Sequence, residues 1–237
     1  QAVWKSVKND PKNKQLMGLD YAMASGVLWW KPAKFFEIYL GHGKQKIGNG
    51  YRSLLLSDQS FNYPYARFDL NFEKAHIKYT STYALLMNLS FTSNSVQSQA
   101  IPFGTEKLLQ KKPFSYQYVS WTPIRNLSIG VFQGIVWKPS DERNRLSPNL
   151  DILNPLIGVN TGIYGFNSFP KILLGLDASV KLTKKLHTYF QLAYDGKKGV
   201  SQDRAGYGWQ FGIKAFDAFT VKNLFLQVES NVYQNSL

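Results

Sequence analysis

The stretch KILLGLDASVKLTKKLHTYFQLAYDG, residues 171–196, alternates apolar and polar side chains in two successive runs. In the first run Ile172 and Leu174 fall on one face and Asp177 and Ser179 on the other, because successive residues of a strand point to opposite faces. The second run repeats the pattern after a short Thr-Lys-Lys connection. The stretch therefore predicts a hairpin of two long antiparallel strands.

The same alternation extends along much of the chain, and no repeat or change of composition divides residues 1–237 into domains. We expect about ten strands in all, most of about 9–13 residues, whereas strands of soluble proteins usually have about 5–6. Strands of roughly 9–11 residues suit a tilted crossing of a membrane. The other predicted strands are 19–30, 34–41, 64–73, 74–87, 114–122, 126–138, 206–216 and 221–233.

The predicted fold class is all-β, an antiparallel transmembrane β-barrel of the outer-membrane type in a single domain. One face of the strands is apolar and aromatic, and the other is polar, charged or glycine, as in a barrel that separates lipid from a polar lumen. Tight connections such as 183–185 contrast with long ones at 92–113 and 138–170, which matches the two rims of such a barrel. One or two helical turns are expected at 105–112.

Tryptophan residues gather near the ends of the predicted strands, at Trp29, Trp30, Trp121 and Trp137. Amphipathic rings prefer the level of the lipid head groups, so these residues are expected to form interfacial girdles. The alternative interpretation is the ordinary aromatic core of a soluble β-protein.

The composition favours an anionic partner. Lys and Arg number 28 against 15 Asp and Glu, giving a net charge of +13, and aromatic residues reach 15%. Such a charge attracts nucleic acid, phospholipid head groups or acidic polysaccharide, although it also serves solubility. The absence of cysteine excludes a disulfide framework and a thiolate metal site.

The glycine-rich stretch GHGKQKIGNGYRSLLLSD, residues 41–58, resembles a phosphate-binding loop only in its first glycines. Asn49 and Gly50 stand where that loop requires a lysine and a hydroxyl residue, and no helix-forming run follows. The segment KKPFSYQY at 111–118 mixes basic and aromatic residues, but no nucleic-acid-binding motif accompanies it. The sequence therefore predicts neither a nucleotide cofactor nor a nucleic-acid partner.

Catalytic and metal-binding patterns are equally weak. The three histidines, His42, His76 and His187, are scattered, without partners at ligand spacing. His42, Ser53 and Asp58 could be assembled into a triad only on paper, since no nucleophile elbow is present. We therefore expect a protein that is not an enzyme and that needs no cofactor and no metal.

A longer pattern carries a family resemblance. Residues 43–58 read G-K-x-x-I-G-x-G-Y-R-S-L-L-L-S-D and are followed by N-Y-P-Y at 62–65. This string resembles the Wzi-like capsule-assembly and RemB-like gliding-motility proteins. The motif positions singled out here are Gly43, Gly48, Gly50, Ser53, Leu54, Ser57 and Asp58.

The resemblance implies a non-enzymatic β-barrel in the outer membrane of a Gram-negative bacterium, involved in surface polysaccharide attachment or gliding. Family barrels are larger than 237 residues can build, so the chain is expected to form part of a larger barrel. The implied partners are outer-membrane lipid or lipopolysaccharide, anionic surface polysaccharide and other envelope proteins. Two alternatives stay open: a porin-like channel or barrel subunit of an envelope or secretion complex, and a soluble carbohydrate-binding β-sandwich.

The motif region also contains the candidate binding residues. Cationic side chains here suit sulfate, phosphate or uronate groups, and tyrosine rings can stack on sugars. The alternative is that Arg52 pairs with Asp58 or Asp69 and only satisfies buried polar groups. The glycines are expected to thin one face so that a folded-in loop, from Tyr51 to Asp58, can approach the sheet. The candidates are Lys44, Lys46, Tyr51, Arg52, Tyr63, Tyr65 and Arg67.

Overall fold

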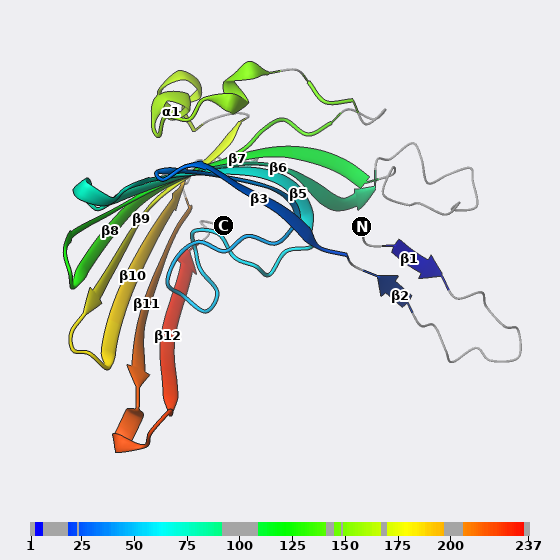
Figure 1. Cartoon of the computed structure of the whole chain (residues 1–237). Coiled ribbons are helices and arrows are strands. Elements are labelled where there is room, and N and C mark those ends of the chain that lie inside the picture. Colours follow the sequence, from blue (N-terminus) through cyan, green and yellow to red (C-terminus); the bar gives the residue numbers. More distant parts are fainter. Residues whose placement is uncertain are drawn as a thin grey trace, which may run out of the picture.

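The computed structural model describes residues 3–6, 19–22, 24–91, 109–140, 145–147, 149–166, 170–196 and 206–234. Ten strands form one antiparallel sheet in which each strand pairs with its neighbours in sequence, from β3 to β12 (Figure 1). The remaining two strands, β1 and β2, pair only with each other. The strands are β1 (Val3–Ser6), β2 (Leu19–Ala22), β3 (Gly26–Ala33), β4 (Phe36–Gly43), β5 (Tyr63–Phe72), β6 (Ile77–Phe91), β7 (Leu109–Ile124), β8 (Leu127–Val136), β9 (Lys171–Lys181), β10 (Leu186–Asp195), β11 (Gly206–Phe216) and β12 (Phe225–Gln234).

The sheet curves into an open trough (Figure 1). The prediction of an all-β antiparallel fold with about ten long strands is confirmed. Closure into a barrel is not observed, because β3 and β12 are the two edges of the sheet within the described ranges and no pairing joins them. The ten strands also form one continuous sheet, whereas a β-sandwich consists of two packed sheets.

The connections alternate between the two ends of the strands as predicted. The turns after β3, β5, β7, β9 and β11 are short, and they include the 3₁₀ helices η1 (Glu73–Ala75) and η4 (Ala218–Thr220). The connections at the other end are long, and one of them contains η3 (Leu150–Leu153) and the helix α1 (Val159–Tyr164). No helix in the described part of the chain is long and apolar enough to span a membrane.

Three predicted boundaries were wrong. The predicted strand 19–30 is divided, since β2 ends at Ala22 and pairs with β1, while β3 begins at Gly26. The predicted strand 221–233 begins only at Phe225, because 221–224 form a hydrogen-bonded turn. The helical turn expected at 105–112 is replaced by strand from Leu109 onward, and its earlier residues lie outside the described ranges.

The two faces of the sheet differ in polarity, as the alternation predicted. On the convex face Val131 lies opposite Leu176, which lies opposite Leu192. On the concave face the side chains of Asp177, Gln191 and Gln210 occupy adjacent strands and are buried. Outside the area near Trp137, the convex face from β8 to β12 is therefore apolar and exposed, while the concave face holds buried polar side chains.

The predicted tryptophan girdle is only partly present. Trp30 and Trp121 are exposed, but Trp29 points to the opposite face from Trp30 because the two are consecutive in β3. Trp137 is only 4% exposed, so it was wrongly assigned to the surface. Its side chain is covered by residues of the connection between β8 and β9.

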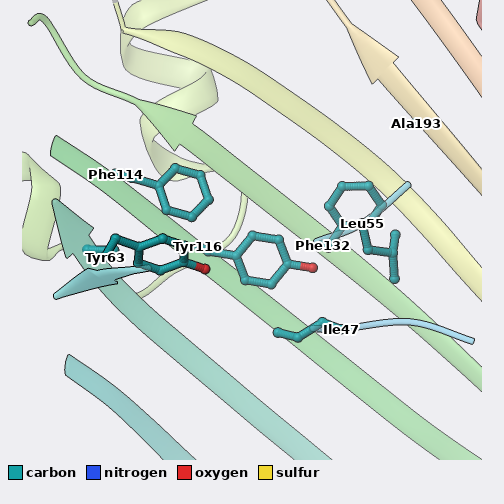
Figure 2. Close-up of a cluster of buried hydrophobic side chains, with 8 residues drawn as sticks. Ile47, Leu55, Tyr63, Phe114, Tyr116, Phe132 and Ala193 are labelled. Atoms are coloured by element: carbon teal, nitrogen blue, oxygen red, sulfur yellow. The ribbon is translucent and has the colours of Figure 1, made fainter. Parts of the chain in front are cut away.

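Residues 44–62, here called the inner segment, connect β4 to β5 and lie within the curve of the sheet (Figure 1). Figure 2 shows how Ile47 and Leu55 of this segment meet aromatic side chains of the sheet. Burial of each such side chain contributes about 1.5–3 kcal/mol. The cluster comprises Ile47, Leu55, Tyr63, Ala84, Phe114, Tyr116, Phe132 and Ala193.

Residues 145–147 and 149–166, here called the cap segment, lie on the opposite, convex side near the long-connection rim (Figure 1). Under the cap segment, Ile135, Trp137 and Ile172 form a second buried cluster. The indole N–H of Trp137 donates to Ser115 Oγ at 3.0 Å, so burying this ring leaves no polar atom unsatisfied. Each face of the sheet is thus covered in part by a different long connection.

Candidate binding surface on the concave face

The glycines of the inner segment allow its backbone to touch the sheet. A Cβ atom on Gly48 would lie 2.2 Å from Ser53 Oγ and 2.3 Å from Gln191 Nε2, and Gly48 has a positive φ of 108°. A Cβ on Gly50 would lie 2.2 Å from Gln210 Oε1. The prediction that these glycines permit a close approach is confirmed, although the chain leaves the sheet at Lys44 rather than at Tyr51.

Buried glutamines of the sheet hold the inner segment. Gln191 Oε1 accepts hydrogen bonds from Ser53 Oγ at 3.2 Å and from the Leu54 backbone N–H at 3.1 Å. Gln210 Nε2 donates to the carbonyl oxygen of Arg52 at 2.9 Å. These bonds hold the backbone of the motif against β10 and β11. They account for the positions of Ser53 and Leu54 in the structure.

Asp177 joins the same network from β9. It accepts hydrogen bonds from Gln191 Nε2 at 3.1 Å, from Tyr118 Oη at 3.0 Å and from Asn49 Nδ2 at 3.4 Å. Sequence reasoning missed Asp177, Gln191 and Gln210 as functional residues. The sequence does contain a sign of their role, because each is a polar residue on the polar face of a strand with alternating polarity.

The inner segment reaches as far as the edge strand β12. The carboxylate of Glu229 accepts a hydrogen bond from the Tyr51 backbone N–H at 2.7 Å. It also accepts from the Tyr189 hydroxyl and, at 2.8 Å, from Asn231 Nδ2. Residues of β9 to β12 therefore contribute side chains to one contact with the inner segment.

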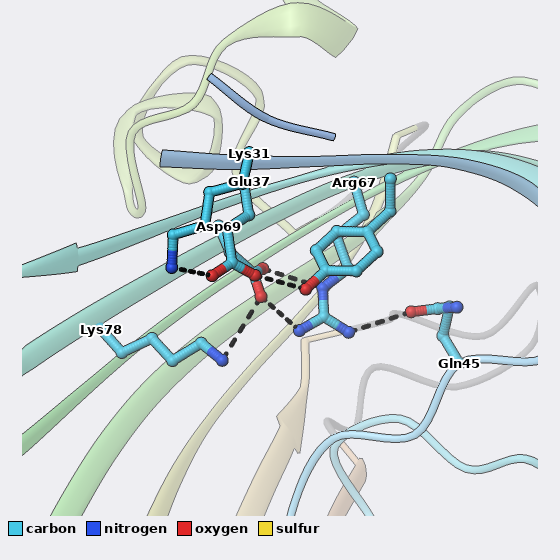
Figure 3. Close-up of polar contacts among 7 residues, drawn as sticks. Lys31, Glu37, Gln45, Arg67, Asp69 and Lys78 are labelled. Carbon is cyan, nitrogen blue, oxygen red and sulfur yellow. Dashed lines mark hydrogen bonds and ion pairs between the residues drawn. The ribbon is translucent and has the colours of Figure 1, made fainter. Parts of the chain in front are cut away.

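An ion-pair cluster lies on the other half of the concave face (Figure 3). Arg67 binds Asp69 through two nitrogens at 2.8 and 2.7 Å, and Lys78 Nζ lies 3.3 Å from Asp69. Gln45 of the inner segment accepts a further bond from Arg67 at 3.1 Å. Asp69 therefore pairs with Arg67 and Lys78, and not with Arg52 as the alternative interpretation expected.

The structure separates the candidate residues into two groups. Tyr63 is only 3% exposed and contacts Tyr65 edge-on at 6.3 Å, so the expectation that Tyr63 stacks on a sugar was wrong. Arg67 is held by Asp69 and lies 5.3 Å from the centre of the Tyr39 ring. These side chains serve the interior of the trough.

The second group remains accessible. Lys44, Lys46 and Arg52 are exposed, and Tyr51 has 66% of its surface exposed. Among the residues that the structure describes, no ion pair neutralises these three cations. Lys214 of β11 adds a further cation, since it interacts electrostatically with Lys46 and lies 5.1 Å from the centre of the Tyr189 ring. An exposed basic surface with one exposed tyrosine results.

The other motif residues have structural positions. Gly43 ends β4, and a Cβ there would meet only ordinary contacts at 3.9 Å. Ser57 Oγ accepts a hydrogen bond from the Gln59 backbone N–H at 3.3 Å, and Asp58 is half-buried. Most motif residues therefore have a structural role in folding the inner segment.

The rim with the short turns contains an ion pair outside the strands. The carboxylate of Asp217 accepts a hydrogen bond from the Asn223 backbone N–H at 2.8 Å and lies 3.2 Å from Lys185 Nζ. The backbone hydrogen bond and then the Lys185 ammonium lower the pKa of Asp217 below its usual value. This pair joins the turn after β9 to the turn after β11.

The fold and this surface define an antiparallel β-trough whose polar face is occupied by an inner segment with exposed cations. Comparison with protein-family models, with curated proteins and with solved structures gives no significant match. Within the described ranges, no three His, Cys, Asp or Glu side chains are placed to hold a metal ion.

Proposed function

We propose that the chain forms the wall of an outer-membrane β-barrel of the Wzi-like or RemB-like type, which retains anionic surface polysaccharide and has no catalytic activity. The observation that carries the proposal is the opposite polarity of the two sheet faces. The apolar face is convex and exposed, while the polar face is concave and filled by the inner segment.

The convex face supports a lipid environment. Soluble monomers rarely expose apolar patches of more than a few hundred Å², yet exposed apolar side chains here follow every strand from β8 to β12. Val228 on β12 is 74% exposed. The exposed convex-face residues of these strands are Ile129, Val131, Leu176, Phe190, Tyr194, Tyr207, Phe211, Ile213, Leu226, Val228 and Val232.

The two sheet edges require partners if the trough lies in a membrane. Unpaired backbone groups in hydrocarbon cost several kcal/mol each, so open edges do not face lipid. The free edges of β3 and β12 would then be paired by further strands. The complete barrel would then have more than ten strands. This agrees with the large barrels implied by the resemblance to the Wzi-like and RemB-like proteins.

The basic surface supports an anionic polysaccharide as the ligand. Lys44, Lys46 and Arg52 of the inner segment are exposed together with Tyr51. Arginine and lysine bind uronate or phosphate groups through charge-assisted hydrogen bonds. The filled concave face is less suited to a diffusion channel, because the inner segment occupies it.

Retention of polysaccharide tests the proposal. We expect the triple variant Lys44→Gln, Lys46→Gln, Arg52→Gln to insert normally into outer-membrane vesicles but to retain about tenfold less acidic polysaccharide. Exposed charge contacts contribute about 0.5 kcal/mol each, and a loss of about 1.4 kcal/mol in total is a factor of ten. The matched control is Lys34→Gln, Lys181→Gln, Lys184→Gln, which removes three exposed cations at the rim with the short turns.

Equal retention by the two triple variants would contradict the polysaccharide assignment. Recovery of the wild-type protein in the soluble fraction, without detergent, would contradict the membrane location. Conductance across a planar bilayer would instead favour the channel.

A further inference from the structure

Two adjoining cavities of about 490 and 420 Å³ lie between the cap segment and the ends of β7 and β8. They share Lys138, Leu146 and Ser147 as lining residues. We call them together the rim cavity. Their volumes fall in the range of about 300–1,000 Å³ that is typical of small-molecule sites.

One half of the rim cavity is polar and basic. It is lined by Lys138, Arg145, Gln110 and Ser140. Ser140 is almost fully buried, and its hydroxyl accepts a hydrogen bond from the Lys111 backbone N–H at 3.0 Å. Gln110 Nε2 donates to the carbonyl oxygen of Ser140 at 3.0 Å. The polar floor is therefore fixed by hydrogen bonds to β7 before any ligand arrives.

The other half is apolar and aromatic, lined by Trp137, Ile152, Tyr164 and Leu146. The rings of Trp137 and Tyr164 meet edge-on, with centres 5.8 Å apart. The hydroxyl of Tyr164 donates to the Asp151 carboxylate, which fixes the ring. The cavity thus combines a cationic end with a rigid apolar wall, which is the chemistry that an anionic amphiphile requires.

The position of the rim cavity fits such a ligand. Along β8, Ile129 and Val131 are exposed on the convex face, and then the face becomes covered by the cap segment as far as Trp137. The cap segment thus separates the exposed band on β8 from the cavity at Trp137. The cap segment itself exposes Leu150 to 84% and Leu156 to 61%, so apolar side chains continue beside the cavity.

We propose that the rim cavity binds a membrane lipid with an anionic phosphate head group. Lys138 contacts the phosphate, and an acyl chain lies along Trp137 and Ile152 toward the exposed Leu150 of the cap segment. This inference rests on the proposed membrane location, which supplies the lipid. Lys111 and Lys112, which directly precede the cavity-lining Pro113 in sequence, increase the positive charge at the same rim.

Native mass spectrometry of the full chain tests the inference, with dioleoylphosphatidylglycerol as the anionic probe and dioleoylphosphatidylcholine as the zwitterionic one. We expect selective retention of the anionic lipid, reduced about fivefold by Lys138→Gln, as is typical for one cation near an anionic membrane surface. Lys184→Gln, which removes an exposed cation at the other rim, leaves retention unchanged. Ser147→Trp fills the cavity and abolishes retention, whereas Ser147→Ala does not.

Two further experiments are needed. Competition distinguishes a lipid from a free phosphate, and flotation distinguishes failure of this inference from failure of the proposed membrane location. Glycerophosphoglycerol and inorganic phosphate carry the anion without an acyl chain, and we expect them to compete at least tenfold more weakly than the lipid. Equal competition would overturn the lipid assignment in favour of a free phosphate. Flotation with vesicles tests the membrane location separately. A protein that floats but shows no selectivity, or loses lipid equally in Lys138→Gln and Lys184→Gln, overturns this inference alone.

Discussion

The inner segment and the cap segment are both long connections that fold back onto the same sheet, but they are held in different ways. The inner segment brings its backbone against the sheet, where Gln191 and Gln210 hydrogen-bond directly to its main chain. The cap segment covers Trp137 and Ile172 with apolar side chains. Gln133 of the sheet likewise accepts a hydrogen bond from the Gly158 backbone N–H of the cap segment at 2.6 Å, so both segments combine main-chain hydrogen bonds with a hydrophobic cluster. Only in the inner segment do glycines place the backbone directly against side chains of the sheet.

The two segments differ in how closely their backbones approach the sheet. The concave face offers donors and acceptors at fixed positions, so only a segment with glycines at the contact points can approach closely enough to use them. The cap segment lies over Trp137 and over Gln133, and no atom lies within 4 Å of a Cβ placed on Gly158. Its apolar contacts tolerate many backbone paths. The comparison therefore predicts that the stability of the inner segment is lowered most by substitutions that enlarge a side chain. The stability of the cap segment is lowered most by substitutions that truncate one.

The largest effect is expected from Trp137→Ala. Removing a buried tryptophan costs about 3–5 kcal/mol, and here it also takes away the surface on which Tyr164 and Ile152 lie. Limited proteolysis of the folded protein should show cleavage within 145–166 at much lower protease concentration, while 44–62 stays protected. Simultaneous cleavage of both segments would show that they do not fold independently.

A smaller effect is expected from Gly48→Ala in the inner segment. The added Cβ meets Ser53 and Gln191, so overpacking is added to an unfavourable φ, and we expect a loss of about 3 kcal/mol in the free energy of unfolding. Gly158→Ala in the cap segment is the matched control. Gly158 also has a positive φ, of 89°, but no atom lies within 4 Å of a Cβ placed there.

The control should therefore cost only about 1 kcal/mol, the conformational contribution alone. Urea unfolding of both variants in lipid vesicles measures the difference. Equal losses for the two glycines would contradict the close contact between the inner segment and β10.

The smallest effect concerns the short-turn rim, which neither segment covers. Because the pKa of Asp217 is lower in the folded than in the unfolded protein, its contribution to stability is fully present above the unfolded pKa of about 4 and is lost as the pH falls through the folded one. Asp217→Asn should lower the urea midpoint slightly at pH 7 and not at pH 2. A difference between the two proteins that is as large at pH 2 as at pH 7 would exclude the ion pair as its cause.

The parts of the fold that the sequence predicted are those in which one local pattern decides the outcome. Alternation alone defines the β9–β10 hairpin, because burial of one face fixes the register. The division between β2 and β3 escaped prediction, since alternation continues through the interruption and only pairing with β1 reveals it. Trp137 was misplaced because the residues that cover it are rich in Asn, Pro and Gly, which is typical of exposed loops.

Only some features of the candidate surface could be predicted from the sequence. Close approach at Gly48 and Gly50 could be inferred, since glycine at such spacing has few other roles in a strand-rich chain. The partner of Asp69 could not be inferred, because Arg67 is two residues away and shares its strand face, whereas Arg52 looked equally available in the sequence. Long-range contacts such as Tyr51 with Glu229 have no local signal.

The contact between Tyr51 and Glu229 also has a mechanical consequence. The inner segment starts at β4 and ends at β5, yet it is hydrogen-bonded to β10, β11 and β12. The inner segment therefore connects strands that lie far apart along the curved sheet. Flattening the sheet would break its hydrogen bonds to β10, β11 and β12. A connection of fixed length limits the curvature of the sheet. In the barrel proposed above, this curvature would determine how many further strands lie between β12 and β3.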